Sequence, residues 1–246
     1  MDRMLYLSMS AAGNTMLAQA VNSNNLANAN TLGFRADLAQ FSSVPVLGTG
    51  HASRVYAVEE PTGVDFNTGS VYHTGNELDM SLNGEGWIAV LAADGTEAYT
   101  RAGDLRVTSA GMLENGAGHP VIGNGGGISI PPAEKIEIGT DGTISIRPVG
   151  QDEKTLATID RIKLVNPPRN MLYKGNDGLF RLKDGMDAVS DASVTVTSGT
   201  LESSNVNMIS ALVNMINLQR QFEMDIKAMK IVEDNDEFAS RMFQLS

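Results

Sequence analysis

Residues 208–229 read MISALVNMINLQRQFEMDIKAM, and their pattern of side chains repeats along the whole segment. Steps of four and three residues alternate without interruption through Met208, Leu212, Met215, Gln219, Phe222, Ile226 and Met229. This heptad pattern is typical of a helix that buries one face against a partner helix. The sequence therefore predicts a long C-terminal helix over about residues 204–245.

A second helix is predicted at the opposite end of the chain, over residues 3–29. Its face follows the same spacing through Met9, Ala12, Met16, Gln19, Ser23 and Leu26. No proline interrupts the segment, and its alanines, leucines, methionines and glutamines favour helix.

The end of this first helix is marked by a cluster of asparagines at positions 22, 24, 25, 28 and 30. Asparagine is a poor residue inside a helix and a good terminator, so we expect the helix to end near Asn28 to Asn30, before a turn over Thr31 to Phe34. Two roles are open for the amides. They can cap backbone groups, and they can also bond to the amides of neighbouring copies, since an amide both donates and accepts.

The middle of the chain has a different character. Residues 35–75 carry Pro45, Pro61 and several glycines without a sustained period, which predicts an extended connecting segment. Residues 76–200 predict β structure. Asp94-Gly95 and Asp141-Gly142 are hairpin signals between apolar or alternating runs, and Val194 to Val196 adds another strand. The absence of helical segments between these runs argues against parallel βαβ units.

We therefore expect an α+β fold, in which N- and C-terminal helices form a coiled-coil-like pair beside a central, mainly antiparallel β domain. The expected parts are residues 1–34, 35–75, 76–200 and 201–246. A lone helix draws its stability from packing, and a two-helix pair leaves part of each apolar face in water. Either other copies of the chain cover those faces, or both helices pack onto the β domain as in an ordinary α+β protein.

Composition excludes several classes of function. The chain holds 18 basic and 29 acidic residues, a net charge of -11, which disfavours binding to nucleic acid or to anionic membranes. It has no cysteine, so disulfides and thiolate chemistry are excluded. No apolar run is long enough to span a membrane, and the first residues lack a convincing signal-peptide pattern, so we expect no cleaved signal.

No catalytic, cofactor-binding or metal-binding residues are predicted. His51, His73 and His119 lack the spacing of metal ligands, and we expect them at the surface or in turns. The glycine-rich residues 123–127 lack the lysine and the following helix of a phosphate loop. Asp234 to Asp236 lacks the glycine and distal glutamate of a calcium loop. We expect no small-molecule substrate and no enzyme.

Three segments resemble the flagellar rod and hook proteins, the axial proteins of the bacterial flagellum. The first is Asn22 to Arg35, NSNNLANANTLGFR, similar to their N-terminal signature. The second begins at YTRAGD (99–104) and continues through GML (111–113) and GHPVIG (118–123). The third is GTLESSNV (199–206) with the following Met215-Ile216, Gln219-Arg220 and Phe222 to Met224. The segments span nearly the whole chain in the family's order. Leu32 departs from it, because the family often has proline there.

Within that family, Met1-Asp2, Gln19 to Val21 and Phe34 to Leu38 resemble the proximal-rod proteins of the F type. The resemblance implies a structural subunit that leaves the cell unfolded through the flagellar type III export apparatus, without a cleaved signal. It would polymerise in the periplasm with copies of itself and with other proximal and distal rod proteins, as part of the shaft that transmits torque. A distal-rod or hook-type protein is the alternative within the family, and a secreted carbohydrate-binding or adhesive β module is the alternative outside it.

The resemblance and the helix pattern together predict an assembly interface near the two ends of the chain. Its expected residues are Met9, Met16, Asn24, Asn25, Leu26, Asn28, Asn30, Gly33, Phe34, Leu212, Met215, Gln219, Phe222, Ile226 and Met229.

Overall fold

The computed structural model describes residues 3–45, 55–60, 63–148, 150 and 156–244. Two compact units make up the chain. The helical unit contains Met1–Ala29, Ala36–Asp65 and Val206–Ser246, and the β unit contains Asn30–Arg35 and Phe66–Asn205.

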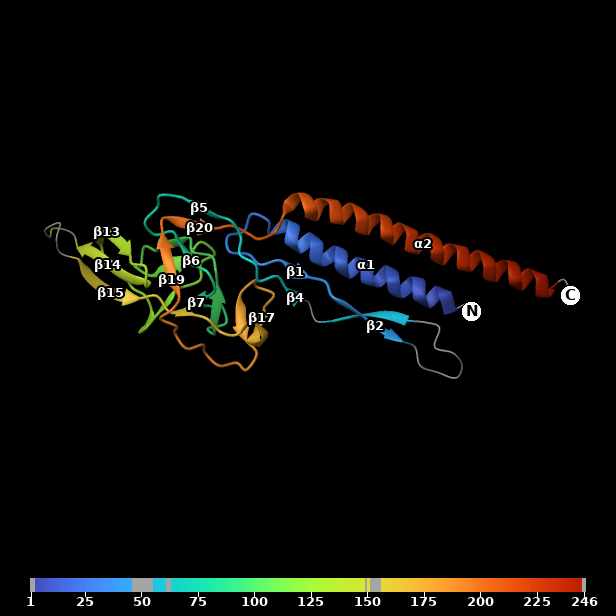
Figure 1. Cartoon of the computed structure of the whole chain (residues 1–246), viewed down its shortest axis with the longest axis horizontal. Helices are drawn as coiled ribbons and strands as arrows, with labels where there is room; N and C mark the ends of the chain where they lie inside the picture. Colours follow the sequence, from blue (N-terminus) through green and yellow to red (C-terminus); the bar gives the residue numbers. More distant parts are fainter. Residues whose placement is uncertain (1–2, 46–54, 61–62, 149, 151–155, 245–246) are drawn as a thin grey trace. The chain divides into compact units, whose positions relative to one another are not determined.

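Two long helices dominate the helical unit. Helix α1 (Arg3–Ala27) and helix α2 (Met208–Gln244) lie side by side and antiparallel (Figure 1). At the start of α2, the Asn207 Oδ1 atom accepts a hydrogen bond from the Ser210 N–H at 3.0 Å, as an N-cap residue does. The predicted pair of terminal helices is therefore confirmed.

The segment after α1 forms short antiparallel strand pairs within the helical unit. Strand β1 (Asp37–Leu38) pairs with β4 (Gly63–Val64), and β2 (Phe41–Pro45) pairs with β3 (Val55–Glu59). Strands β1 and β3 contact α1, and the Asn14 side-chain amide donates a hydrogen bond to the Ala57 carbonyl at 2.9 Å. The described part of this segment thus lies along the first helix.

The β unit is built from short strands, and every strand pairing among its described residues is antiparallel. The strands are β5 (Val71–His73), β6 (Met80–Asn83), β7 (Trp87–Leu91), β8 (Glu97–Thr100), β9 (Leu105–Val107), β10 (Leu113–Asn115), β11 (Ile122–Gly123), β12 (Gly126–Gly127), β13 (Ala133–Ile138), β14 (Thr143–Pro148), β15 (Ala157–Arg161), β16 (Leu164–Val165), β17 (Leu172–Lys174), β18 (Phe180–Leu182), β19 (Thr195–Ser198) and β20 (Thr200–Glu202). A 3-10 turn, Arg169–Met171, precedes β17.

These strands form one five-stranded sheet in the order β16-β7-β8-β18-β17, one three-stranded sheet in the order β13-β14-β15, and several two-stranded pairs. Both predicted hairpins are confirmed: Asp94-Gly95 joins β7 to β8, and Asp141-Gly142 joins β13 to β14. The core lies between the sheets and includes Ile88, Val90 and Ile144, whose side chains are fully buried. The α+β class with a central antiparallel region is therefore confirmed.

No helix among the described residues is long and apolar enough to cross a membrane.

Candidate assembly surfaces

The most deeply buried side chains of the helix pair are mostly small or polar. On α1 the buried positions are Ser8, Ala12 and Thr15, and on α2 they include Ala211 and Val232. Burying a small side chain removes less apolar surface from water than burying a large one.

Hydrogen bonds among the described residues tie the helices together. The Asn22 side-chain amide donates to the Ala211 carbonyl at 2.8 Å. The Thr15 hydroxyl lies 2.9 Å from the Ala11 carbonyl of its own helix and 3.2 Å from the Asp225 carboxylate. Asn22 pairs with Ala211, whereas Thr15, nearer the N-terminus of α1, pairs with Asp225, nearer the C-terminus of α2. The two contacts therefore fix the antiparallel register of the helices.

A different face of α1 points into solvent. We call it the α1 stripe, and it consists of Tyr6, Met9, Gly13, Met16 and Ala20, which follow one another in steps of three and four and are all exposed. Met9 and Met16, both predicted interface residues, are each 58% exposed. The spacing is that of one continuous helix face.

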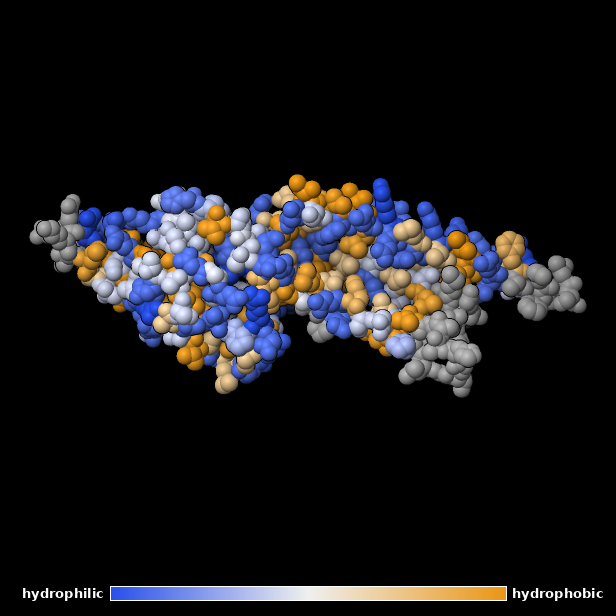
Figure 2. All heavy atoms as spheres, viewed as in Figure 1, coloured by the Kyte–Doolittle hydropathy of each residue, from blue (hydrophilic) through white to orange (hydrophobic). Residues whose placement is uncertain are grey.

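The first turns of α2 carry the largest group of exposed apolar side chains on the helices. We call it the α2 patch, and it consists of Met208, Ile209, Leu212, Val213 and Ile216. Ile209 is 76% exposed, and Figure 2 shows hydrophobic side chains gathered over the start of this helix. Exposed clusters of this kind mark protein–protein contact sites more often than single exposed residues do.

The structure divides the predicted seam of α2 between two faces. Leu212, Gln219 and Ile226 are exposed, whereas Met215, Phe222 and Met229 are half-buried. The sequence reasoning missed a second apolar register, displaced by one residue and formed by Ile209, Val213 and Ile216. The doubled pattern was the available signal, because a helix with two apolar registers has more apolar surface than one partner helix covers.

The asparagine cluster makes hydrogen bonds within the chain. The Asn25 amide donates to the Asp37 carbonyl and its Oδ1 accepts from the Asp37 N–H, both at 2.8 Å, so the side chain pairs with β1 as a neighbouring strand would. The Asn24 amide donates to the Asp37 carboxylate at 3.0 Å, and the Asn28 amide donates to the Asn24 carbonyl at the same distance. Leu26 is half-buried in the same turn, and Asn30 is exposed.

Gly33 and Phe34, also predicted for the interface, are buried within the β unit. Gly33 has φ +64, and a Cβ atom there would lie 2.4 Å from the Arg101 backbone carbon, so only glycine fits. The Lys174 ammonium lies 3.7 Å from the centre of the Phe34 ring and donates a hydrogen bond to the Arg35 carbonyl at 2.8 Å. The turn after α1 is thus held by the β unit.

Behind this turn lies a buried cluster of three charged side chains. The Glu202 carboxylate lies 2.6 Å from the Arg35 Nη2 atom and 3.1 Å from the Arg101 Nε atom, and it accepts the Gly69 N–H at 2.9 Å. Burial lowers the pKa of Arg101 to about 10, and Glu202 opposes that shift, so the guanidinium stays charged at neutral pH. Two buried cations share one anion, which makes Glu202 the critical member.

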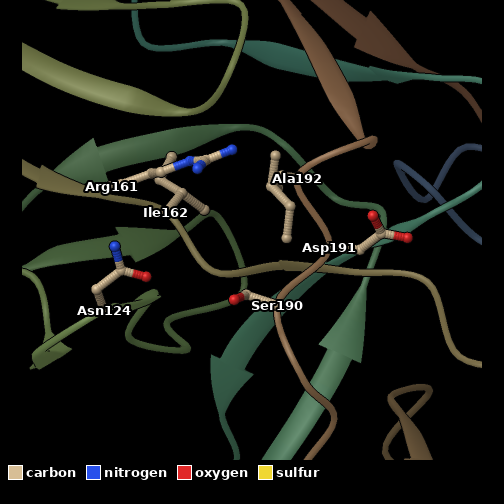
Figure 3. Close-up of a pocket in the computed structure, with 7 residues that line it drawn as sticks. Asn124, Arg161, Ile162, Ser190, Asp191 and Ala192 are labelled. Carbon is tan, nitrogen blue, oxygen red and sulfur yellow. The ribbon is translucent and has the colours of Figure 1, made fainter.

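The described part of the β unit shows no constellation suited to catalysis. No group of three or more His, Asp or Glu side chains there could hold a metal ion. The pocket in Figure 3 brings Asn124 from the β11–β12 turn near Arg161 at the end of β15 and Ser190 from the segment before β19. It contains no nucleophile paired with a base. His73 is exposed, and His51 lies outside the described residues.

The sequence matches three families of flagellar proteins. Residues 5–35 match the family described as "Flagella basal body rod protein", residues 81–146 match "Flagellar hook protein FlgE/F/G D1 domain", and residues 197–242 match "Flagellar basal body rod FlgEFG protein C-terminal". The first and third matches cover the two helices and the segments that connect them to the β unit.

Individual flagellar rod proteins are similar over all or much of the chain. The chain is 40% identical to the flagellar basal-body rod protein FlgF of Escherichia coli over 252 residues, which cover 100% of both chains. It is 44% identical to FlgF of Salmonella typhimurium over 74% of this chain and 72% of that one. It is 32% identical to the rod protein FlgG of Bacillus subtilis over 59% of this chain and 61% of that one.

Proposed function

The chain belongs to the FlgF family of flagellar basal-body rod proteins, and from this premise we propose that it builds the proximal rod by packing its terminal helices against those of neighbouring subunits. As a member of this family it is a structural subunit of the flagellar basal body, not an enzyme, and it assembles with other axial proteins of the rod and hook.

The observation that carries the proposal is the incomplete burial of the helix pair. Helix α2 seals one face through Ala211 and Val232, while the α2 patch remains exposed. Burying a large aliphatic side chain stabilises a contact by roughly 1.5–3 kcal/mol, so covering the patch would be strongly favourable. A neighbouring subunit is the expected cover, because a rod subunit works beside other subunits.

The test compares Ile216→Asp, in the α2 patch, with Gln221→Glu, which adds the same charge at an exposed position of the same helix. Each variant replaces the natural chain in motile cells, and its amount in purified basal bodies is measured by mass spectrometry. We expect Ile216→Asp to be nearly absent and Gln221→Glu to assemble normally. Normal assembly of Ile216→Asp would contradict the proposed role of the patch.

We further propose that the subunit is exported unfolded by the flagellar type III apparatus, keeps its N-terminus and occupies the rod in the periplasm. The likeness to FlgF proteins and the predicted lack of a signal peptide support this. The intact mass of the chain from purified basal bodies tests it, because removal of a signal would shorten the N-terminal peptide. The division into residues 1–34, 35–75, 76–200 and 201–246 also stays a prediction about the assembled subunit.

The distal rod is the second candidate position, since the chain also resembles FlgG proteins. Photo-crosslinking from position 209, in the exposed α2 patch, distinguishes the two. Cross-links to subunits on the membrane side support a proximal position, and cross-links to hook-side subunits alone support a distal one.

A further inference from the structure

The chain carries its sulfur only in methionine. It has 13 methionines and no cysteine, so a two-electron oxidant that attacks sulfur meets only thioethers. Among methionines with described side chains, Met80 is fully buried, and three are half-buried, at positions 112, 215 and 229. The exposed ones are Met9, Met16, Met171, Met186, Met208 and Met224.

Four of the exposed methionines lie on the two helices. Met9 and Met16 stand one heptad apart in the α1 stripe, and Met208 opens the α2 patch. Met224, on α2, is 61% exposed. The other two, Met171 and Met186, belong to the β unit. Three of these exposed thioethers, those of Met9, Met16 and Met208, therefore lie on the surfaces that we assign to assembly, and that of Met224 is exposed further along α2.

We propose that Met9, Met16, Met208 and Met224 form a redox-sensitive modification site, whose oxidation by a peroxide prevents the subunit from joining the rod. The inference rests on the proposed function, because it requires these helix faces to become buried between subunits. Incorporated subunits are protected, since burial removes the thioethers from solvent.

The chemistry is an oxygen transfer. A lone pair of the methionine sulfur attacks one oxygen of hydrogen peroxide, the O–O bond breaks, and the other oxygen leaves as water after proton transfer. The sulfur is oxidised by two electrons to the sulfoxide and the peroxide is reduced. The reaction requires no cofactor and no ionised protein group.

The effect on assembly follows from polarity. A sulfoxide oxygen is a hydrogen-bond acceptor, and burying it in an apolar contact without a donor is unfavourable. The flexible, apolar methionine side chain packs well against irregular neighbours. Oxidation to the polar sulfoxide weakens that packing at each oxidised position. Methionine sulfoxide reductases reverse the reaction, so the modification acts as a switch.

The test uses the full chain in cells that lack their own copy and also lack methionine sulfoxide reductases. One variant replaces the four exposed helix methionines by leucine (M9L, M16L, M208L and M224L), which conserves volume and helix preference. The matched control replaces Met171 and Met186 by leucine in the β unit. Cells assemble flagella with and without sublethal hydrogen peroxide, and mass spectrometry quantifies the chain in basal bodies and the sulfoxides in the unassembled pool.

With peroxide we expect the natural chain and the β-unit control to fall by about tenfold in basal bodies, a loss equal to about 1.4 kcal/mol of assembly free energy. The four-leucine variant should keep its peroxide-free level, and the unassembled natural chain should carry sulfoxide on the four exposed helix methionines. Equal losses in all three chains, or no sulfoxide on the helices, would overturn the inference. The proposed function fails separately, if Ile216→Asp assembles normally without peroxide.

Discussion

The β unit and the helical unit bury their apolar side chains to very different degrees. In the β unit, Met80, Ile88 and Val90 are completely buried in one shared core. In the helical unit, the buried positions hold mostly small side chains such as Ala12 and Ala211, and larger ones such as Ile209 stay exposed. One chain therefore contains a unit that completes its own core and a unit that leaves much of its apolar surface uncovered.

The difference comes from the two periodicities. When apolar and polar residues alternate along a strand, all the apolar side chains point to one side of the sheet, where another sheet can cover them completely. A helix with two adjacent apolar registers has a wider apolar face, and one antiparallel partner helix covers only part of that face.

The predictions below change one unit at a time. Trp87, the single tryptophan, is buried in the β unit and reports its unfolding by fluorescence, while circular dichroism at the helix band follows mainly α1 and α2.

The largest effect is expected for Glu202→Gln. The substitution keeps the shape but removes the one carboxylate that pairs with both Arg35 and Arg101, and breaking such a buried cluster costs about 3–5 kcal/mol. The midpoint of urea unfolding followed by Trp87 fluorescence should fall accordingly. Glu137→Gln is the control, because Glu137 pairs with Lys135 at the surface of the β unit, where an ion pair contributes about 0–1 kcal/mol. Equal midpoints for the two variants would show that the β unit does not depend on its buried charges.

The second prediction separates the two faces of α2. Ile226→Asp changes an exposed side chain, so it should weaken assembly by about 2 kcal/mol or more, an effect of about 30-fold, while the helix signal stays unchanged. Phe222→Asp changes a half-buried side chain and should lower both assembly and the thermal stability of the helices. Basal-body incorporation and thermal melts measure the two properties. If Ile226→Asp also melts the helices, the exposed face is already in use within the single chain.

Much of this contrast could be predicted from the sequence. The helix pair followed from the alternation of four- and three-residue steps, and the hairpins followed from Asp94-Gly95 and Asp141-Gly142. The positions of Gly33 and Phe34 could not be predicted, because local pattern does not reveal that the turn after α1 belongs to the β unit. The pairing of Arg35 with Glu202 joins residues far apart in sequence, and no spacing rule predicts such a contact.

The asparagine cluster was predicted as a terminator, and its contact with Asp37 was also beyond local pattern. Asn25→Ala removes two hydrogen bonds to the Asp37 backbone, with a typical loss of about 0.5–1.5 kcal/mol for each bond. We expect the helix signal to melt at a lower temperature and Trp87 fluorescence to be unaffected. Ser23→Ala, at an exposed position of the same helix, is the control. A shift of the Trp87 transition would mean that the amide stabilises both units.

The smallest effect is expected for Asp104, an acid in the β unit whose ionised form is disfavoured by burial. Burial raises the pKa of Asp104, and nearby Asp79 adds to the shift, while hydrogen bonds from backbone N–H groups and the positive charge of Arg106 oppose it. An acid with a raised pKa in the folded state destabilises the fold while it is ionised, and protonation relieves the penalty as pH falls through that pKa. Asp104→Asn should therefore stabilise the β unit at neutral pH by about 1 kcal/mol or less, and its advantage should shrink in acid.

Asp177 provides a control of opposite sign. Arg181 donates hydrogen bonds to both of its carboxylate oxygens, at 3.0 and 2.7 Å, and this lowers the pKa of Asp177. The stability that this ion pair gives the fold is present above the pKa of Asp177 in the unfolded chain. It is lost as pH falls through the lower pKa that Asp177 has in the folded chain. Asp177→Asn should thus destabilise slightly at neutral pH, with the deficit disappearing in acid. Trp87-monitored urea unfolding at several pH values measures both variants. If both substitutions change the free energy of unfolding in the same direction at neutral pH, burial does not determine how Asp104 affects stability.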